Sequence, residues 1–463
     1  MDPNIILLIL DSARVQNMSL YGYDKNTTPF LEGFAERSTV YTQARAPSIH
    51  SIASHVSMFT GLHLEEHGAT DHESQIDTSR SIWTELSRDF GYDTGFFTNN
   101  YVISQTSNLE DCFEYSSEMR LRAKKKYLGR DPIDEEGRFL TSDSKLGRAA
   151  NHLWNKTLKL RDRVISPDRY APGSKFVDKF LDWQKDRSGP WAACINLMDT
   201  HYPFQPEPEF DRWGSSELRS IQDDQPSTGE LLGGTGWDRL EGLEPLYDGT
   251  ILQADTIVEN LVSELEKRSE LEDTLLIVTS DHGEGFGERS RTVPGVRMRR
   301  HSWGIHEVLT HVPLLINYPG QEDGAVVDSV FSLTDIPELV RTVRDGASIP
   351  TEIDRKPVLS STFRLLPEKA ADYDEIDGVE NYVGPWRAVY EDNGSGVRKY
   401  VQKDEHFATI DIETPRDVEV VSTEPTRRVQ EEFEPLSDSD IQTETAEIDE
   451  ESRQRLEDLG YIR

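Results

Sequence analysis

Four side chains of this sequence could together hold a divalent cation and attack an ester. Asp11 ends one continuous apolar run, and the pair Asp281 and His282 follows a second such run. Carboxylate oxygens and an imidazole nitrogen are ligands for Ca²⁺, Mg²⁺, Mn²⁺ or Zn²⁺. Ser51 stands directly before a predicted helix, where unpaired N–H groups and the helix dipole favour a bound anion. The set predicts a cation site beside a hydroxyl group.

Ordinary structural roles are the alternatives for these residues. A serine immediately before a helix is often a simple cap, and an aspartate at the end of a strand often occupies a turn. Local sequence leaves both explanations open for Ser51 and for Asp11. The run 281–284 is more specific, because Gly283 permits a tight turn directly after a buried strand.

Strands that alternate with helices must position these residues. Continuous apolar runs predict strands buried on both faces of a parallel sheet, and amphipathic stretches between them predict helices. Such alternation favours a doubly wound, mostly parallel α/β sheet flanked by helices, with ligands at the carboxyl ends of the strands. The predicted strands are Asn4–Leu10, 92–98, Trp191–Leu197, Thr274–Thr279 and 312–317, and the predicted helices are 29–37, 52–60 and 246–268.

The chain of 463 residues is too long for one small core and divides into four predicted parts. A catalytic α/β domain carries one charged insertion, and a small α+β subdomain follows it. An acidic, Thr-rich segment is predicted to be mobile, and a short helix closes the chain. The boundaries are 1–345 for the catalytic domain with its insertion at about 119–172, 346–420 for the subdomain, 421–450 for the mobile segment and 451–463 for the closing helix.

Shorter segments add detail to this division. Apolar runs at 386–390 and 398–401 predict strands and make the subdomain antiparallel. The polar, Gly-rich segment 215–236 predicts a surface loop.

The charge of the chain is strongly negative, with 85 acidic residues against 50 basic ones and a formal net charge of −35. Such a chain repels nucleic acid and anionic membranes, so neither is a predicted partner. Abundant carboxylates with more Arg than Lys are typical of proteins from a high-salt cytoplasm, where salt screens the repulsion. The composition predicts a halophilic source, and an ordinary acidic surface with an acidic tail is the alternative.

The two cysteines, Cys112 and Cys194, do not suggest a disulfide framework, which suits a reducing compartment. The apolar stretch 5–10 is too short for the core of a signal peptide or for a membrane span. We therefore expect a soluble, cytoplasmic protein.

Short motifs follow one another along the whole chain, from the first predicted strand to the last predicted helix. They are NIILLILDSAR at 4–14, YGY at 21–23, TPFL at 28–31, SIASH at 51–55 with FTG at 59–61, HYPF at 201–204, TSDHGE at 279–284, His301, HVPLLI at 311–316 and LGY at 459–461. In this order the motifs resemble those of the sulfatase family within the alkaline phosphatase superfamily, in a haloarchaeal-type member, and the resemblance implies an alkaline phosphatase-like fold.

The resemblance implies a role for each matching residue. Asp11, Asp281 and His282, together with Ser51, would hold one divalent metal ion, and residue 51 would attack sulfur or phosphorus. The substrate would be a small-molecule or glycan ester of sulfate or phosphate. Such a metal ion lowers the pKa of the attacking group and neutralises charge on the ester.

Further candidates come from the same resemblance. His201 and His301 would bind the transferred group or protonate the leaving oxygen. Arg14 is a candidate for substrate binding, and His55 is a candidate catalytic residue. The alternatives are a surface histidine before a proline for His201, and a basic loop for His301.

Two residues depart from the family pattern. Sulfatases usually convert a Cys or Ser to formylglycine in a motif that ends in Arg, and His55 stands in that place, which argues against conversion of Ser51. Ser12 stands where the family usually has a second Asp. Both departures favour phosphoester chemistry by an unmodified Ser51, as a phosphodiesterase, phosphomonoesterase or phosphotransferase. This is the alternative to cleavage of a sulfate ester, which the overall order of the motifs implies.

Two other readings compete with an ester hydrolase. The segment HLEEH at 63–67 matches the pattern of inverted zinc peptidases, but Gly61 and Gly68 argue against the extended helix that this chemistry needs. The second competing interpretation is a non-catalytic family member that binds an anionic ligand. The loss of a family Asp at Ser12 and of the family Arg at His55 favours that interpretation, and the retained site residues oppose it.

Overall fold

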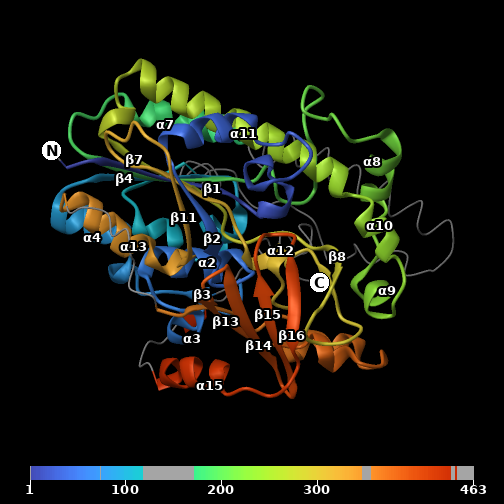
Figure 1. Cartoon of the computed structure of the whole chain (residues 1–463). Helices are drawn as coiled ribbons and strands as arrows, with labels where there is room; N and C mark the ends of the chain where they lie inside the picture. The colour runs from blue at the N-terminus through green and yellow to red at the C-terminus, as the bar shows by residue number, and fades with distance from the viewer. Residues whose placement is uncertain (1, 73, 118–170, 347–355, 439–443, 446–463) are drawn as a thin grey trace, which may run out of the picture.

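An eight-stranded sheet forms the centre of the computed structural model, which describes residues 2–72, 74–117, 171–346, 356–438 and 444–445 (Figure 1). The strand order is β11-β2-β10-β7-β1-β6-β4-β5. Most neighbours are parallel, and β10 is antiparallel to both β2 and β7. The bounds are β1 (Asn4–Leu10), β2 (Thr39–Arg45), β4 (Asp93–Thr98), β5 (Tyr115–Ser116), β6 (Trp191–Leu197), β7 (Thr274–Thr279), β10 (Leu314–Asn317) and β11 (Ala325–Ser332).

These strands confirm the predicted doubly wound, mostly parallel sheet. The five apolar runs all form strands, and β1, the first of them, lies between β6 and β7 with its residues after Asn4 fully buried. The fifth run begins at Leu314 rather than at residue 312. The residue before it is Pro313, which has no N–H group to donate to a neighbouring strand.

Helices cover both faces of the sheet (Figure 1). Successive side chains of β1 point to opposite faces, so Leu8 packs in one apolar cluster and Leu7 in another. The first cluster includes residues of α1 (Pro29–Phe34), α7 (Ser174–Gln184) and α11 (Glu244–Lys267), and the second includes residues of α2 (Ser51–Thr60), α4 (Ile82–Phe90) and α13 (Ile336–Arg344). Among the described helices, none is both long enough and apolar enough to cross a membrane.

The segment 215–236, predicted as a surface loop, instead contains two short helices, so that prediction was wrong. They are α8 (Ser216–Asp223) and α9 (Thr228–Leu232), and α10 (Trp237–Glu241) follows them. Ser215 and Ser227 accept N–H bonds from the first turns of α8 and α9. Capping serines and few buried side chains make such helices look like a polar loop in sequence.

A five-stranded antiparallel sheet forms the C-terminal subdomain, in the order β12-β13-β14-β15-β16. The predicted strands at 386–390 and 398–401 lie within its second and third strands. The bounds are β12 (Val358–Thr362), β13 (Trp386–Asp392), β14 (Val397–Lys403), β15 (His406–Ile412) and β16 (Val418–Ser422), with α14 (Pro367–Ala370) between the first two strands.

Part of the segment 421–450, predicted to be mobile, packs on this sheet. The helix α15 (Arg428–Phe433) buries Val429 and Phe433 against Val389 of β13. Further on, β17 (Glu444–Thr445) pairs with β3 (Ser74–Gln75) of the large domain. Most of the predicted insertion, residues 119–170, and the predicted closing helix lie outside the described residues.

A buried ion cluster joins the subdomain to the large domain. Glu307, at the start of α12 (Glu307–Thr310), lies 2.9 Å from Lys399 Nζ of β14 and 3.2 Å from an Arg45 nitrogen at the end of β2. Burial alone would raise the pKa of the Glu307 carboxyl, but Lys399 and Arg45 hold it well below its usual range. One carboxylate therefore neutralises cations from both parts of the molecule.

We expect Glu307→Gln to destabilise the protein by about 3–5 kcal/mol, because two buried cations lose their only carboxylate partner in this cluster. Urea denaturation measures the change. The control is Arg398→Gln on β14, which breaks the partly exposed ion pair of Arg398 with Asp411 of β15 and should cost under about 1 kcal/mol. Equal losses in the two variants would contradict the role given to Glu307.

Candidate active site

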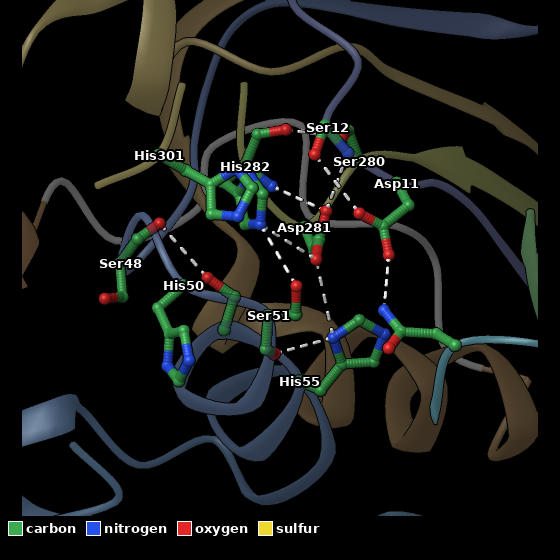
Figure 2. Close-up of polar contacts among 12 residues, drawn as sticks. Asp11, Ser12, Ser48, His50, Ser51, His55, Ser280, Asp281, His282 and His301 are labelled. Carbon is green, nitrogen blue, oxygen red and sulfur yellow. Dashed lines mark hydrogen bonds and ion pairs between the residues drawn. The ribbon is translucent and has the colours of Figure 1, made fainter. Parts of the chain in front are cut away.

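The carboxyl ends of β1 and β7 bring three potential metal ligands together. Asp11 directly follows β1, and Asp281 and His282 follow β7, its parallel neighbour in the sheet. One ligand atom from each residue lies within 4.8 Å of the other two, and all three side chains are fully buried (Figure 2). The sequence placed these residues at strand ends, and the pairing of the strands makes them a single site.

Asp11 is held by amide donors that the sequence analysis missed. One carboxylate oxygen accepts hydrogen bonds from Asn100 Nδ2 at 2.8 Å and Asn196 Nδ2 at 3.1 Å. Burial alone would raise the pKa of the Asp11 carboxyl, but the hydrogen bond from Asn196 contributes to lowering it. Asn196 interrupts the apolar run of β6, and an amide in a fully buried strand was the available signal.

Asp281 carries the most direct sign of a missing cation. Its Oδ1 accepts hydrogen bonds from the N–H groups of Ser12 at 3.1 Å and His282 at 2.9 Å. Its Oδ2 is buried and accepts no hydrogen bond from the described residues. A buried, unsatisfied carboxylate oxygen is costly, and a cation held between Asp11, Asp281 and His282 would satisfy it. The residues present therefore fit a divalent metal ion.

The backbone around these ligands is tightly specified. Ser12 has a φ of 66°, and this left-handed conformation accompanies the bond from its N–H to Asp281. Gly283 was predicted to permit a tight turn. Its φ is not positive, and a Cβ at this position would lie 1.9 Å from the Val308 carbonyl oxygen. Close approach of two backbones, rather than the turn, requires glycine here.

Ser51 is the first residue of α2, and His50 is the residue that precedes the helix. The prediction that the helix begins at residue 52 was therefore wrong by one residue. Ser51 Oγ lies 3.2 Å from His282 Nε2. His282 Nδ1 lies 2.9 Å from the Gly283 carbonyl oxygen and donates its N–H there, so Nε2 carries the lone pair. The hydroxyl thus faces the metal ligands at the positive end of a helix.

His55 lies one turn further along α2. Its Nδ1 donates a hydrogen bond of 2.7 Å to the Ser51 carbonyl oxygen, and it lies 3.7 Å from Asp281 Oδ2. The imidazole is fully buried, and its Nε2 has no hydrogen bond among the described residues. His55 therefore supports the backbone of the residue next to the metal ligands, and its catalytic role stays a prediction.

Two further histidines complete the predicted set. His301, which closely follows β9 (Arg297–Arg299), has its ring centroid 4.5 Å from that of His282 and 5.3 Å from that of His201. His201 Nδ1 donates to the Tyr202 carbonyl oxygen at 2.6 Å. Burial lowers the pKa of both His201 and His301, so both imidazoles are neutral near pH 7 without a ligand.

Arg14, predicted to bind substrate, is fully engaged by protein groups. Its guanidinium forms ion pairs with Glu244 at 2.6 Å and Glu288 at 2.5 Å, and it donates to the Glu284 carbonyl oxygen at 2.9 Å. These contacts anchor the turn that follows β7 to α11 and β8 (Phe286–Arg289). They support a positioning role, and contact with substrate stays a prediction.

Glu284 belongs to a motif that the sequence analysis quoted, but the residue received no role there. Its side chain is fully buried, neither carboxylate oxygen has a hydrogen bond among the described residues, and Oε2 lies 3.8 Å from His301 Nδ1. Burial raises the pKa of the carboxyl to about 8. Glu284 is therefore largely a neutral acid at pH 7 beside the histidine pair.

The histidines of the HLEEH segment have separate partners. The helix there, α3 (Leu64–His67), has four residues and ends before Gly68. His63 Nδ1 pairs with Glu65 at 2.7 Å, whereas His67 Nε2 bonds with Ser57 Oγ of α2 at 3.0 Å. Glu65 is also tied to Arg387 of the subdomain at 3.0 Å. The segment packs the two domains together and does not present two histidines on one helical face.

Comparisons with known proteins agree with this geometry. The family model described as Sulfatase matches residues 3–340. The chain is 22% identical to the N-acetylglucosamine-6-O-sulfatase of Bacteroides thetaiotaomicron, over 80% of this chain and 74% of that protein. It is 23% identical to the arylsulfatase of Clostridium perfringens, over 76% of this chain and 77% of that protein.

Solved structures confirm the fold class. The phosphonate monoester hydrolase of Agrobacterium radiobacter superimposes with a TM-score of 0.59 at 16% identity, over 94% of this chain and 93% of that one. BT4656, solved in complex with its substrate D-glucosamine-2-N,6-O-disulfate, superimposes with a TM-score of 0.59 at 17% identity, over 89% of this chain and 91% of that one.

We expect Asp281→Asn to lower the affinity for a divalent cation by more than about 100-fold, because it removes one of two carboxylate ligands. Calorimetric titration with Mn²⁺ and Ca²⁺ measures the affinity. Asp255→Asn is the control, since Asp255 is also buried but accepts hydrogen bonds from the backbone of α1. One tightly bound equivalent in the Asp281→Asn protein would refute the assignment.

Without metal, the Glu284→Gln variant should be more stable than the wild-type protein, and this difference should grow as the pH rises. The folded-state pKa is about 8 against an ordinary 4.5, so the favourable contribution of the protonated acid is present below pH 4.5 and is lost as the pH rises through 8. The gain from Gln should be small at pH 5 and reach roughly 4 kcal/mol above pH 8.

Denaturation of both proteins in EDTA at pH 5 and pH 9 tests this expectation. Substitution of the exposed Glu272 by Gln is the control and should show no such growth. A gain from Glu284→Gln that is the same at both pH values would rule out the proposed protonation of Glu284.

Proposed function

Because this chain belongs to the sulfatase family, we propose that it is a metal-dependent hydrolase that cleaves a sulfate ester by attack from residue 51. One observation carries the proposal. Ser51 Oγ lies 3.2 Å from His282 Nε2 at the start of α2, against the cluster of Asp11, Asp281 and His282. A nucleophile, a cation site and a helix N-terminus therefore meet at one point.

Asp11, Asp281 and His282, with Ser51 beside them, would hold one divalent cation. A bound cation would supply Lewis acidity, which favours the deprotonated form of a nearby oxygen and offsets the negative charge of the ester. Two carboxylates suit Ca²⁺, Mg²⁺ or Mn²⁺, and the imidazole also admits Zn²⁺. The N–H groups at the start of α2 favour the negative charge that develops near residue 51.

We infer that His201 and His301 handle protons near the leaving group. Both are neutral in the ligand-free site because burial lowers the pKa of each. An anionic ester would raise those pKa values, since a nearby negative charge favours the imidazolium form. Binding of the substrate would therefore supply the proton that one of these histidines gives to the leaving oxygen.

The substrate is proposed to be a sulfated small molecule or glycan. Support comes from the names of the N-acetylglucosamine-6-O-sulfatase relative and of the structure with its disulfated glucosamine substrate. We also propose that the protein works in a high-salt cytoplasm. The net charge of −35 and the two buried free cysteines, Cys112 and Cys194, support this setting.

Phosphoester hydrolysis by an unmodified Ser51 is the second candidate. His55 stands where formylglycine-forming motifs have Arg, and it is committed to the Ser51 carbonyl oxygen. An unmodified serine can form and release a phosphoester intermediate, whereas with sulfate it lacks the route that an aldehyde hydrate offers for expelling the group. The phosphonate monoester hydrolase among the structural neighbours fits this candidate.

Ser51→Ala should lower kcat by at least about 10³-fold, because the attacking oxygen is lost. Ser54→Ala is the matched control, because Ser54 is buried in the same helix and its hydroxyl donates to the Ser48 carbonyl oxygen. Hydrolysis of 4-nitrophenyl sulfate, 4-nitrophenyl phosphate and bis-4-nitrophenyl phosphate identifies the ester class. Undiminished activity in Ser51→Ala would exclude Ser51 as the nucleophile.

Mass spectrometry of the residue-51 peptide from the native host separates the two candidates. Loss of two hydrogens would identify formylglycine and a sulfatase mechanism. An unmodified peptide together with phosphoester turnover would establish the second candidate instead. Turnover of none of the three esters, without a bound metal ion, would indicate the non-catalytic alternative.

A further inference from the structure

Arg300 has an unfavourable backbone conformation directly before His301. Its φ is 45°, in the left-handed region that suits glycine and asparagine. Two backbone hydrogen bonds with Gly285 hold it there, with N to O distances of 2.7 and 3.1 Å. A strained position filled by a long cationic side chain points to a use for that side chain.

The side chain of Arg300 is held in one orientation. The guanidinium carbon lies 3.4 Å from the centroid of the Tyr202 ring, and one terminal nitrogen donates to Gln225 Oε1. Tyr202 itself is fixed, because its hydroxyl donates to the Gln222 carbonyl oxygen at 3.3 Å. The C-terminal end of α8 and the loop after it therefore pre-organise this arginine.

Arg300 carries an uncompensated positive charge in a strongly acidic chain. No carboxylate of the described residues lies within ion-pair distance of its guanidinium, and its buried Nε has no hydrogen bond among them. Arg14, in contrast, is neutralised by Glu244 and Glu288. An arginine with no carboxylate partner among the described residues is suited to an anion from outside the chain.

The position of Arg300 indicates which part of the substrate would carry this anion. Contacts run in order from Ser51 to His282, from His282 to His301 and from His301 to His201. Arg300 stacks on Tyr202, the residue after His201, and its charge acts on His201 and Glu284. It therefore lies at the far end of this series from the nucleophile, beyond the place of the transferred group.

We propose that Arg300 binds a second anionic group, a sulfate or carboxylate on the alcohol part of the substrate, and so selects doubly charged esters. The inference rests on the proposed function for the identity of the transferred group. A planar guanidinium stacked on an aromatic ring presents paired N–H donors that match the oxygens of such a group.

Inert sulfonates test the inference without any turnover. Calorimetry compares linear alkanedisulfonates, from ethane- to hexanedisulfonate, with the monosulfonate of the same chain length. The wild-type protein should prefer the disulfonate of one chain length by at least about tenfold, the strength of a hydrogen-bonded charge pair. Arg300→Asn should lose that preference and bind the monosulfonates within about twofold of wild type, because only the second anion contacts Arg300.

Three variants make this result specific. Asparagine suits the left-handed backbone, so Arg300→Asn should fold, and its thermal midpoint checks this. Arg300→Lys keeps the charge without the planar fork and should keep part of the preference. Arg297→Gln removes from β9 a positive charge that is already paired with Glu241 of α10, and this variant should keep the whole preference for the disulfonate.

Several outcomes would overturn the inference. They are equal losses of monosulfonate and disulfonate affinity in Arg300→Asn, an unchanged preference in that variant, or no preference in the wild type. Hydrolysis assays judge the proposed function separately. A protein that prefers disulfonates through Arg300 but hydrolyses no sulfate ester would keep the inference and lose the proposed function.

Discussion

Two carboxylates buried side by side are the constraint on which the site depends. Asp11 and Asp281 follow adjacent parallel strands, so the pairing of β1 with β7 brings them to the same edge of the sheet. Like charges in a buried place repel, and neither carboxylate can reach water. Amide groups of Asn100 and Asn196 and the N–H of Ser12 offset part of this cost. Asp281 Oδ2 accepts no hydrogen bond from the described residues, and a cation held between Asp11, Asp281 and His282 would satisfy it.

The same constraint explains the groups that surround the carboxylates. His282 directs its Nδ1 hydrogen to the Gly283 carbonyl oxygen, which leaves the Nε2 lone pair for the cation site and for Ser51. The helix α2 begins at Ser51 itself, so its free N–H groups lie where negative charge develops. The subdomain is tied to the same region through Glu307, which neutralises Arg45 and Lys399. A stable interface between the domains thus supports the strand ends that carry the site.

The strands and the metal ligands could be predicted because both depend on local patterns. A fully buried strand needs an uninterrupted apolar run, and a polar residue at its end stands out against that run. Segment 215–236 was mistaken for a loop because capping serines and few buried side chains identify a short helix only weakly. The roles of Asn100, Glu284 and Arg300 depend on contacts between distant segments, which no local pattern encodes. Gly283 was singled out correctly, but the close approach of Val308 that requires it is a tertiary feature.

Charge distribution explains how so acidic a chain can bind an anionic ester. The net charge of −35 repels anions at long range, but in the proposed high-salt cytoplasm salt would screen that field over a few ångströms. Inside the site, the charges of the nearby groups determine whether an anion binds. Burial keeps His201 and His301 neutral and Glu284 largely protonated, so the site adds little negative charge beyond the two carboxylates that a cation would neutralise. Arg300, which has no carboxylate partner among the described residues, adds a positive charge that acts on His201 and Glu284. In the proposed mechanism, the neutral histidines would leave the affinity for anions to a bound cation and to this arginine. The charge of the bound ester would then make the histidines proton donors.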